Sequence, residues 1–144
     1  MIRGTVLNSG TAKGETLVLT EPVSFWGAFD PRSGVIVDTH HPQCGVSLAG
    51  RILLLPETRG SGGTPGGIAE AVRRGTGPLG VILITPDINL AVGAQVAAAL
   101  YGKQCPVIAV AAEDYAKLVQ CQRLAIARDG TITAAMSAPA SATV

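Results

Sequence analysis

Residues 53–75 read LLLPETRGSGGTPGGIAEAVRRG, which is an apolar run, a glycine-rich turn and a stretch typical of a helix. A short apolar run followed by a turn and a helix is how a strand–helix–strand unit begins. Thr64 and Pro65 lie where the helix should start, so we expect Thr64 to be the N-cap and Pro65 the first helical residue. The turn between them and the strand is the first place to look for a ligand site.

The same pattern continues downstream of this turn. Continuously apolar runs occupy residues 51–56, 80–85 and 106–111, and such runs are typical of strands buried on both faces of a parallel sheet. Helical patterns lie between them over residues 66–74 and 87–101. Strand–helix–strand–helix–strand order predicts right-handed crossovers and an α/β fold with a parallel sheet flanked by helices.

Each of these two helical stretches has apolar residues on one face, which we expect to pack against the sheet. In the first stretch these residues are Ile68, Ala71 and Val72. In the second they are Ile88, Val92, Val96, Ala99 and Leu100.

The chain outside this region has shorter elements. Residues 4–10 and 14–20 are strand candidates, and DPRSG (30–34) is a turn, in which Asp30 is expected to form the turn rather than act as an acid. Residues 123–135 predict a hairpin with Asp129–Gly130 at its turn. We expect one domain over residues 1–136 and a disordered tail over 137–144.

Composition excludes several classes of function. The net charge is +1 and no basic run occurs, which argues against a nucleic-acid partner. No apolar stretch reaches the roughly 20 residues of a membrane span. Three scattered cysteines, Cys44, Cys105 and Cys121, indicate reduced thiols in a cytoplasmic protein. No Cys-x-x-Cys pair is present, so we expect no metal site within this chain.

The glycine-rich turn does not fit the nucleotide-binding motifs, because the P-loop lysine is absent and Pro65 occupies the last glycine position of G-x-G-x-x-G. A helix N-terminus nevertheless offers free N–H groups to a carboxylate or phosphate. Ser61 lies between glycines that allow close backbone approach, and Arg59 is a plausible anion contact. The substrate-binding candidates of the turn are Arg59, Gly60, Gly62, Gly63 and Thr64. The alternative is that Ser61 is an ordinary serine in a flexible loop and Thr64 only caps the helix.

One further candidate lies outside the turn. His40 and His41 are adjacent in DTHHPQCG, and a histidine there could orient the substrate or donate a proton. We take His41 as the substrate-binding candidate, and the alternative is that both are ordinary loop residues. Neither has the spacing of a metal ligand.

Three motifs together resemble the small-subunit, or swivelling, domain of the aconitase X family. They are SFWGAFDPRSGVIVD (24–38), HPQCGVSLAGRILLLP (41–56) and the RGS (59–61) that opens a helix. The resemblance weakens over the strand–helix repeats and ends near residue 111. It implies a swivelling β/β/α fold, in which helices flank a parallel sheet and a further β-layer is partly open.

The resemblance also implies a function. Members of the family are dehydratases whose large part, a separate subunit or a fused domain, carries an iron or iron–sulfur centre, and no cofactor is expected in the small part. The small part contributes a serine base, which falls on Ser61 here. The implied substrates are small hydroxy acids, namely cis-3-hydroxy-L-proline, which we favour, or mevalonate 5-phosphate. One departure is GGTPGG (62–67), where relatives often have more serines. Because of this departure, the alternative interpretation is a non-catalytic domain that binds a partner or an anion.

Overall fold

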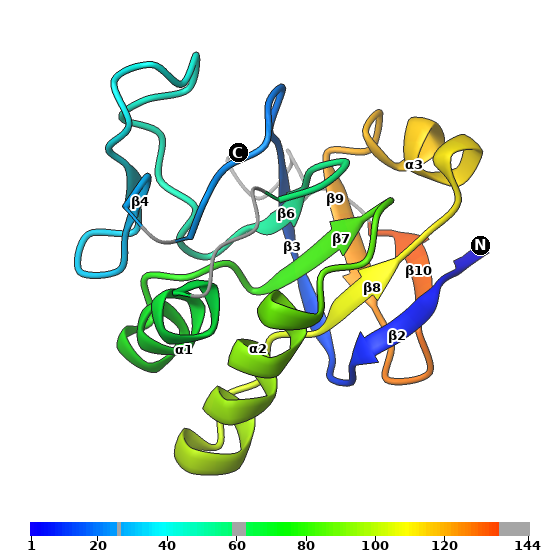
Figure 1. Cartoon of the computed structure of the whole chain (residues 1–144). Helices are drawn as coiled ribbons and strands as arrows, with labels where there is room; N and C mark the ends of the chain where they lie inside the picture. Colours follow the sequence, from blue (N-terminus) through cyan, green and yellow to red (C-terminus); the bar gives the residue numbers. More distant parts are fainter. Residues whose placement is uncertain (26, 59–62, 136–144) are drawn as a thin grey trace, which may run out of the picture.

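The computed structural model describes residues 1–25, 27–58 and 63–135. Its main sheet has eight strands in the order β1-β10-β9-β3-β6-β7-β8-β2 (Figure 1). The strands are β1 (Ile2–Arg3), β2 (Thr5–Asn8), β3 (Ala12–Val18), β6 (Ile52–Leu54), β7 (Gly80–Leu83), β8 (Val107–Ala109), β9 (Arg123–Ile126) and β10 (Thr131–Ala134). The chain therefore has the mixed α/β class that the sequence predicts.

Parallel pairing joins β3, β6, β7 and β8 at the centre of the sheet. The three apolar runs form β6, β7 and β8, and they are buried on both faces as expected. Alternate residues of β6 enter different cores: Leu53 packs under α1 and α2, whereas Ile52 and Leu54 pack with α3. Because both faces are covered, a continuous apolar run replaces the usual in–out alternation.

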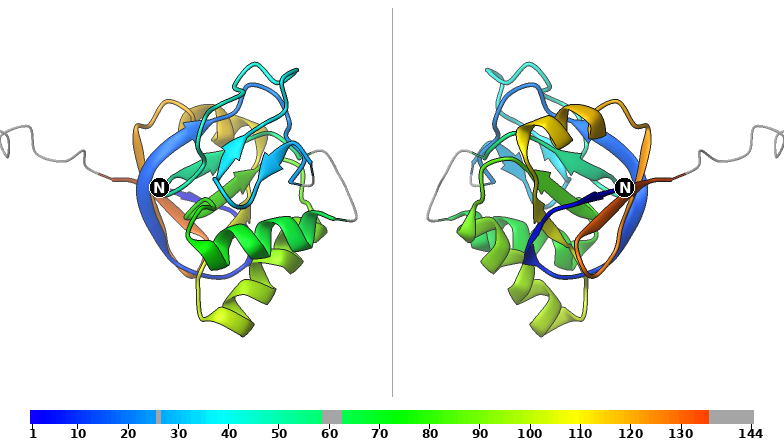
Figure 2. Two further views of the ribbon diagram at one scale, coloured as in Figure 1. Left: turned by 90° about the vertical axis from the view of Figure 1, so that its left-hand side faces the viewer. Right: turned by 90° about the vertical axis from the view of Figure 1, so that its right-hand side faces the viewer.

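The N-terminal segment nearly closes the sheet into a barrel. β1 pairs with β10 at one end of the strand order and β2 pairs with β8 at the other, although only Gly4 separates β1 from β2. A Cβ added at Gly4 would lie 2.7 Å from the carbonyl oxygen of Ala109, so only glycine fits at this junction. Figure 2 shows the resulting rounded sheet from both sides.

Helices α1 (Thr64–Arg74) and α2 (Ile88–Tyr101) pack against each other on one side of the sheet, and α3 (Ala112–Leu118) covers the other side (Figure 2). Gly93 allows α2 to approach α1, because a Cβ at this position would lie 2.6 Å from the carbonyl oxygen of Pro65. Both helices end at glycines in the left-handed region, Gly75 (φ 78°) and Gly102 (φ 64°). Across the described ranges, no helix is long and apolar enough to cross a membrane.

The predicted buried face is confirmed for α1 and wrong for α2. Ile68, Ala71 and Val72 of α1 are buried. In α2, however, the side toward the protein consists of Leu90, Ala91, Gly93, Ala94 and Ala97. The predicted face points outward, with Ile88, Val92, Val96 and Leu100 exposed. The small residues let α2 pack closely against α1. The free energy of this close packing outweighs that of burying the larger apolar residues on the other side of α2.

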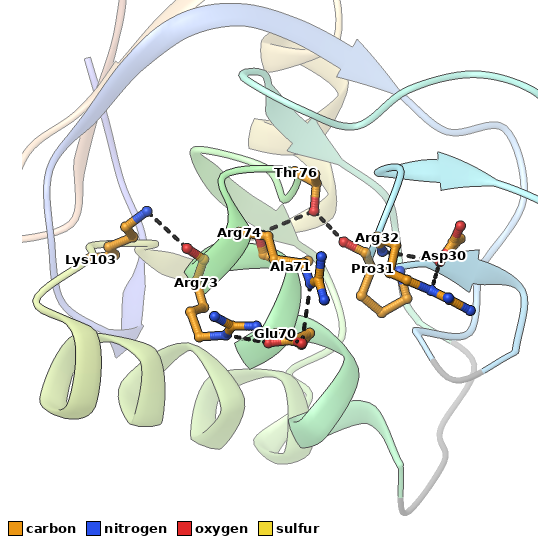
Figure 3. Close-up of polar contacts among 9 residues, drawn as sticks. All are labelled: Asp30, Pro31, Arg32, Glu70, Ala71, Arg73, Arg74, Thr76 and Lys103. Carbon is orange, nitrogen blue, oxygen red and sulfur yellow. Dashed lines mark hydrogen bonds and ion pairs between the residues drawn. The ribbon is translucent and has the colours of Figure 1, made fainter.

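A long segment between β3 and β6 contains the small hairpin of β4 (Phe29–Asp30) and β5 (Val35–Ile36) and lies beside α1. Asp30 is a turn residue, as predicted: its carboxylate accepts hydrogen bonds from the Arg32 N–H (3.0 Å) and the Ser33 hydroxyl (2.9 Å). The hydroxyl of Thr76, just after α1, donates to the Pro31 carbonyl oxygen and ties the hairpin to the helix (Figure 3). The β9–β10 hairpin with its turn at Asp129–Gly130 is also confirmed. The described residues end at residue 135, so the predicted tail over residues 137–144 lies outside them.

Candidate functional site

Two loops meet at the carboxyl-terminal edge of the parallel strands. One follows β6 and leads to α1, and the other follows β7 and leads to α2. Their backbones are joined because the Ile84 and Thr85 N–H groups both donate to the Pro56 carbonyl oxygen, at 3.0 and 2.9 Å. Ligands of open α/β sheets usually bind at this edge.

A hollow of about 340 Å³ lies between these two loops. Its lining residues are Glu57, Thr58, Thr85, Pro86, Asp87, Ile88 and Asn89. Thr58 is the last described residue before the turn that carries Ser61. The hollow therefore adjoins the first end of the candidate loop.

Asp87 connects the two loops through its side chain. Its Oδ1 accepts a hydrogen bond from the Leu90 N–H at 3.2 Å, which makes Asp87 the N-cap of α2. Its Oδ2 accepts a hydrogen bond from the Thr58 hydroxyl. One carboxylate thus fixes both the start of α2 and the end of the segment that enters the candidate loop.

Sequence reasoning missed this pair of residues. A signal for Asp87 was present, because an aspartate after proline and before an apolar helical pattern is a typical N-cap. No signal identified Thr58, since its partner is 29 residues away and the contact depends on how the two loops meet.

Four of the predicted site residues, Arg59, Gly60, Ser61 and Gly62, lie outside the described residues. The structure describes the two ends of this turn, Thr58 and Gly63. These ends place the turn between β6 and α1, as expected from the sequence. The roles predicted for the four residues stay predictions.

Thr64 does not have the capping role that the sequence predicts. The N-cap of α1 is Gly63, without a side-chain cap, and Thr64 is the first helical residue, followed by Pro65. Helix α1 therefore starts one residue earlier than predicted. The reason is that proline is tolerated throughout the first turn, where its missing N–H costs no hydrogen bond.

The hydroxyl of Thr64 is fully buried at this helix start. Its Oγ1 has no hydrogen-bond partner in the part of the chain that the structure describes. A buried polar group without a partner costs about 1–3 kcal/mol. An unpartnered hydroxyl beside the N–H groups of a helix N-terminus is suited to an anionic ligand, because both donate hydrogen bonds and the helix dipole favours negative charge.

His41 contributes to loop structure. It is 7% exposed, its Nε2 lies 3.1 Å from the Glu21 carbonyl oxygen and its Nδ1 accepts from the Gln43 N–H at 3.0 Å. In this arrangement Nε2 donates and Nδ1 accepts, so backbone groups occupy both ring nitrogens. His41 also does not line the hollow between the two loops. Its substrate contact stays a prediction, which this geometry does not favour.

The residues described here do not fit an iron or iron–sulfur centre. Cys44 is exposed, Cys105 is buried and Cys121 is intermediate, and all three are free thiols. Burial raises the pKa of Cys105 to about 12, which disfavours the thiolate that binds metals. In the described ranges, no group of three His, Cys, Asp or Glu residues is placed to hold a metal ion.

Comparison with protein families identifies the domain. Residues 1–134 match the model of the aconitase X swivel domain. The chain belongs to this family.

Two curated relatives differ in size. A cis-3-hydroxy-L-proline dehydratase of Pseudomonas aeruginosa is 42% identical over 101 residues, which cover 70% of this chain and 17% of that protein. A phosphomevalonate dehydratase small subunit of Methanosarcina acetivorans is 31% identical over 93 residues, 65% of each chain. The part of this swivel domain that matches the Pseudomonas protein therefore covers less than a fifth of that protein.

A solved structure has the same fold. The crystal structure of Thermococcus kodakaraensis aconitase X in its holo form contains a chain that is 25% identical, with a TM-score of 0.78. The match covers 94% of this chain and 98% of the Thermococcus chain. An aconitase X chain of the size of this swivel domain thus exists as a separate polypeptide.

Proposed function

We propose that this chain is the small subunit of an aconitase X-type dehydratase that acts on cis-3-hydroxy-L-proline. The observation that carries the proposal is the 42% identity, over 101 residues, to the Pseudomonas cis-3-hydroxy-L-proline dehydratase, whereas the phosphomevalonate dehydratase small subunit of Methanopyrus kandleri is 40% identical over a shorter stretch of 81 residues. The reaction removes an α-proton and the hydroxyl group on the next carbon, which leave together as water while a carbon–carbon double bond forms.

The candidate loop would supply the groups that act on the α-carbon. Ser61, as an alkoxide, would take the α-proton, and N–H groups of the glycine-rich turn would lower the pKa of its hydroxyl. Arg59 and the N-terminus of α1 would hold the substrate carboxylate. The buried Thr64 hydroxyl supports this placement, because it lacks a partner among the described residues and adjoins the same helix start.

The partner in this proposal is a large aconitase X subunit. The name of the Methanosarcina relative, a small subunit, supports a two-chain enzyme. The large subunit would carry the iron or iron–sulfur centre, a Lewis acid for the departing hydroxyl group. We also propose a cytoplasmic location, which the free thiols support because disulfides are rare in that compartment.

Mevalonate 5-phosphate is the second candidate substrate. The size of the Methanosarcina relative favours it, because that protein is a small subunit and is matched over 65% of its length. A domain that binds a partner or an anion without catalysis is the third alternative, and the departure in GGTPGG (62–67) favours it.

Co-expression with the large subunit of the same source separates these alternatives. The purified complex is assayed for dehydration of cis-3-hydroxy-L-proline and of mevalonate 5-phosphate. We expect turnover of the first substrate only. Turnover of the second alone would contradict the proposed substrate, and turnover of neither by an assembled complex would favour the non-catalytic alternative.

The same complex tests the residues of the loop. General-base catalysis contributes about 10²–10⁴-fold, so Ser61→Ala should lower kcat by at least that factor and change KM little. Arg59→Ala should instead raise KM, because it removes a charged contact to the carboxylate. Ser9→Ala is a matched control, since Ser9 is exposed and lies near Gly102 at the far end of α2. Normal kcat in an assembled Ser61→Ala complex would exclude Ser61 as the base.

A further inference from the structure

Helix α2 carries large apolar residues on its outer side as well as apolar residues on its buried side, and its exposed polar side chains include Asn89 and Gln95. Its fourteen residues, Ile88–Tyr101, contain no charged side chain. Four large apolar residues form what we call the outer stripe. They are Ile88 (74% exposed), Val92 (41%), Val96 (37%) and Leu100 (68%).

The spacing of the outer stripe aligns its members along the helix. They recur every four residues, so they follow one side of α2 over about 18 Å. A row of large apolar side chains exposed along one helix is typical of a surface that another protein covers. Helix α2 is too short to cross a membrane, so its outer side is suited to burial against another protein.

The outer stripe is continuous with the candidate site. Ile88, its first member, also lines the hollow at the carboxyl edge of the sheet together with Thr58 and Asp87. A subunit that completes a site at this edge would meet Ile88 first and could continue along α2. We propose that the outer stripe is part of the surface that binds the large aconitase X subunit, an inference that rests on the proposed function.

The size of the stripe favours the large subunit over a second copy of this chain. A strip about 18 Å long and about 10 Å wide covers roughly 200 Å², whereas a stable interface buries about 800 Å² on each partner. Two copies that met through this strip alone would form a contact too small for a stable dimer. A large subunit that covers both the sheet edge and the stripe would bury more, and its facing surface should be apolar and uncharged.

Calorimetric titration with the purified large subunit tests the proposal. Val96→Lys and Leu100→Lys place a charge on the stripe, and we expect each to raise the dissociation constant at least 10-fold. Ala116→Lys is the matched control, because Ala116 is exposed on α3 at the other side of the sheet. Thermal unfolding of each isolated variant shows whether the fold is retained, and the control should bind like the wild type.

Three results would overturn the proposal. The first is wild-type affinity of both folded stripe variants. The second is failure of the wild-type chain to bind the large subunit. The third is an isolated wild-type dimer in sedimentation that Leu100→Lys dissociates while binding to the large subunit is unchanged, which would make a second copy the occupant. Binding is measured without substrate, so a tight but inactive complex would contradict the proposed activity and leave this inference intact.

Discussion

The hydroxyl of Thr58 donates a hydrogen bond to Oδ2 of Asp87, the residue whose Oδ1 caps helix α2. This contact joins the segment that enters the candidate loop to the helix that carries the outer stripe. The two ends of the loop are therefore held differently: a side-chain hydrogen bond fixes the first end, and the start of α1 fixes the second.

Replacing Thr58 by valine should weaken this connection without changing the shape of the side chain. A hydrogen bond to a charged group contributes about 1.5–3 kcal/mol, and the partial exposure of this pair places the expected loss of unfolding free energy near the lower value. In the assembled enzyme we expect kcat to fall and KM to change less, because the loop is displaced from its working position.

Two variants make this measurement specific. Thr58→Ser keeps the hydroxyl and should restore most of kcat. Thr5→Val removes an exposed hydroxyl on β2, away from the hollow, and should act like the wild type. An unchanged kcat in Thr58→Val would show that the hydrogen bond does not position the loop.

Thr64→Val tests whether the buried hydroxyl at the start of α1 has a ligand. Removing a buried polar atom that has no partner among the described residues should leave the melting temperature unchanged or raise it. If the hydroxyl contacts the substrate, KM of the assembled enzyme should rise several-fold. A clear drop in melting temperature would instead indicate a structural hydrogen bond of this hydroxyl.

Gly93→Ala should destabilise the contact between α1 and α2. The added methyl group would lie 2.6 Å from the Pro65 carbonyl oxygen and would also overlap with Ile68, and such overpacking typically costs about 1–3 kcal/mol. Gly66→Ala is the matched control on α1, because among the described residues no atom beyond its chain neighbours and the helix's own backbone lies within 4 Å of the added Cβ. That change should stabilise the protein by up to about 1 kcal/mol. Chemical denaturation of both variants measures the difference, and equal effects would contradict the packing argument.

Glu70 should make stability depend on pH in the acid range. Hydrogen bonds from Arg73 and then Arg74 lower its pKa from 4.5 to about 2 (Figure 3). Because the folded-state pKa is lower than the ordinary value of 4.5, the ionised Glu70 carboxylate stabilises the fold, and this contribution is complete above pH 4.5. The contribution is lost as the pH falls from 4.5 toward 2.

Glu70→Gln is the variant that measures this contribution. Its deficit in melting temperature at pH 7 should shrink as the pH is lowered through this range. Glu21→Gln controls for the loss of one negative charge, because Glu21 is exposed and lies outside the helices that the structure describes. A deficit that stays constant with pH would contradict the assignment to the Glu70 carboxylate.

The order of the elements could be predicted from the sequence because it depends on local patterns. Residues 52–56 are apolar throughout, and Gly102 terminates its helix through its own backbone conformation. The buried side of α2 could not be predicted in this way. Both of its sides are apolar, so periodicity does not distinguish them, and the decision depends on how closely Gly93 lets α1 approach.

In the candidate site, too, local sequence predicts some features and tertiary contacts determine others. The position of the loop between β6 and α1 follows from the order of strand and helix. The hydrogen bond of Thr58 depends on a contact between distant segments, and the burial of the Thr64 hydroxyl, which has no partner among the described residues, depends on tight local packing. Single-residue preferences contain no information about such contacts.

The closure of the sheet at Gly4 has a consequence for the order of folding. Ile2 of β1 pairs with Ile132 of β10. Strand β1 therefore has no partner until residue 132 has left the ribosome. Pairings between such distant segments slow folding, because the loop between them must be ordered first. Until then, the strand edges that β1 and β2 later cover stay open to other chains. Protection from aggregation is therefore one of the last properties that this domain acquires during its synthesis.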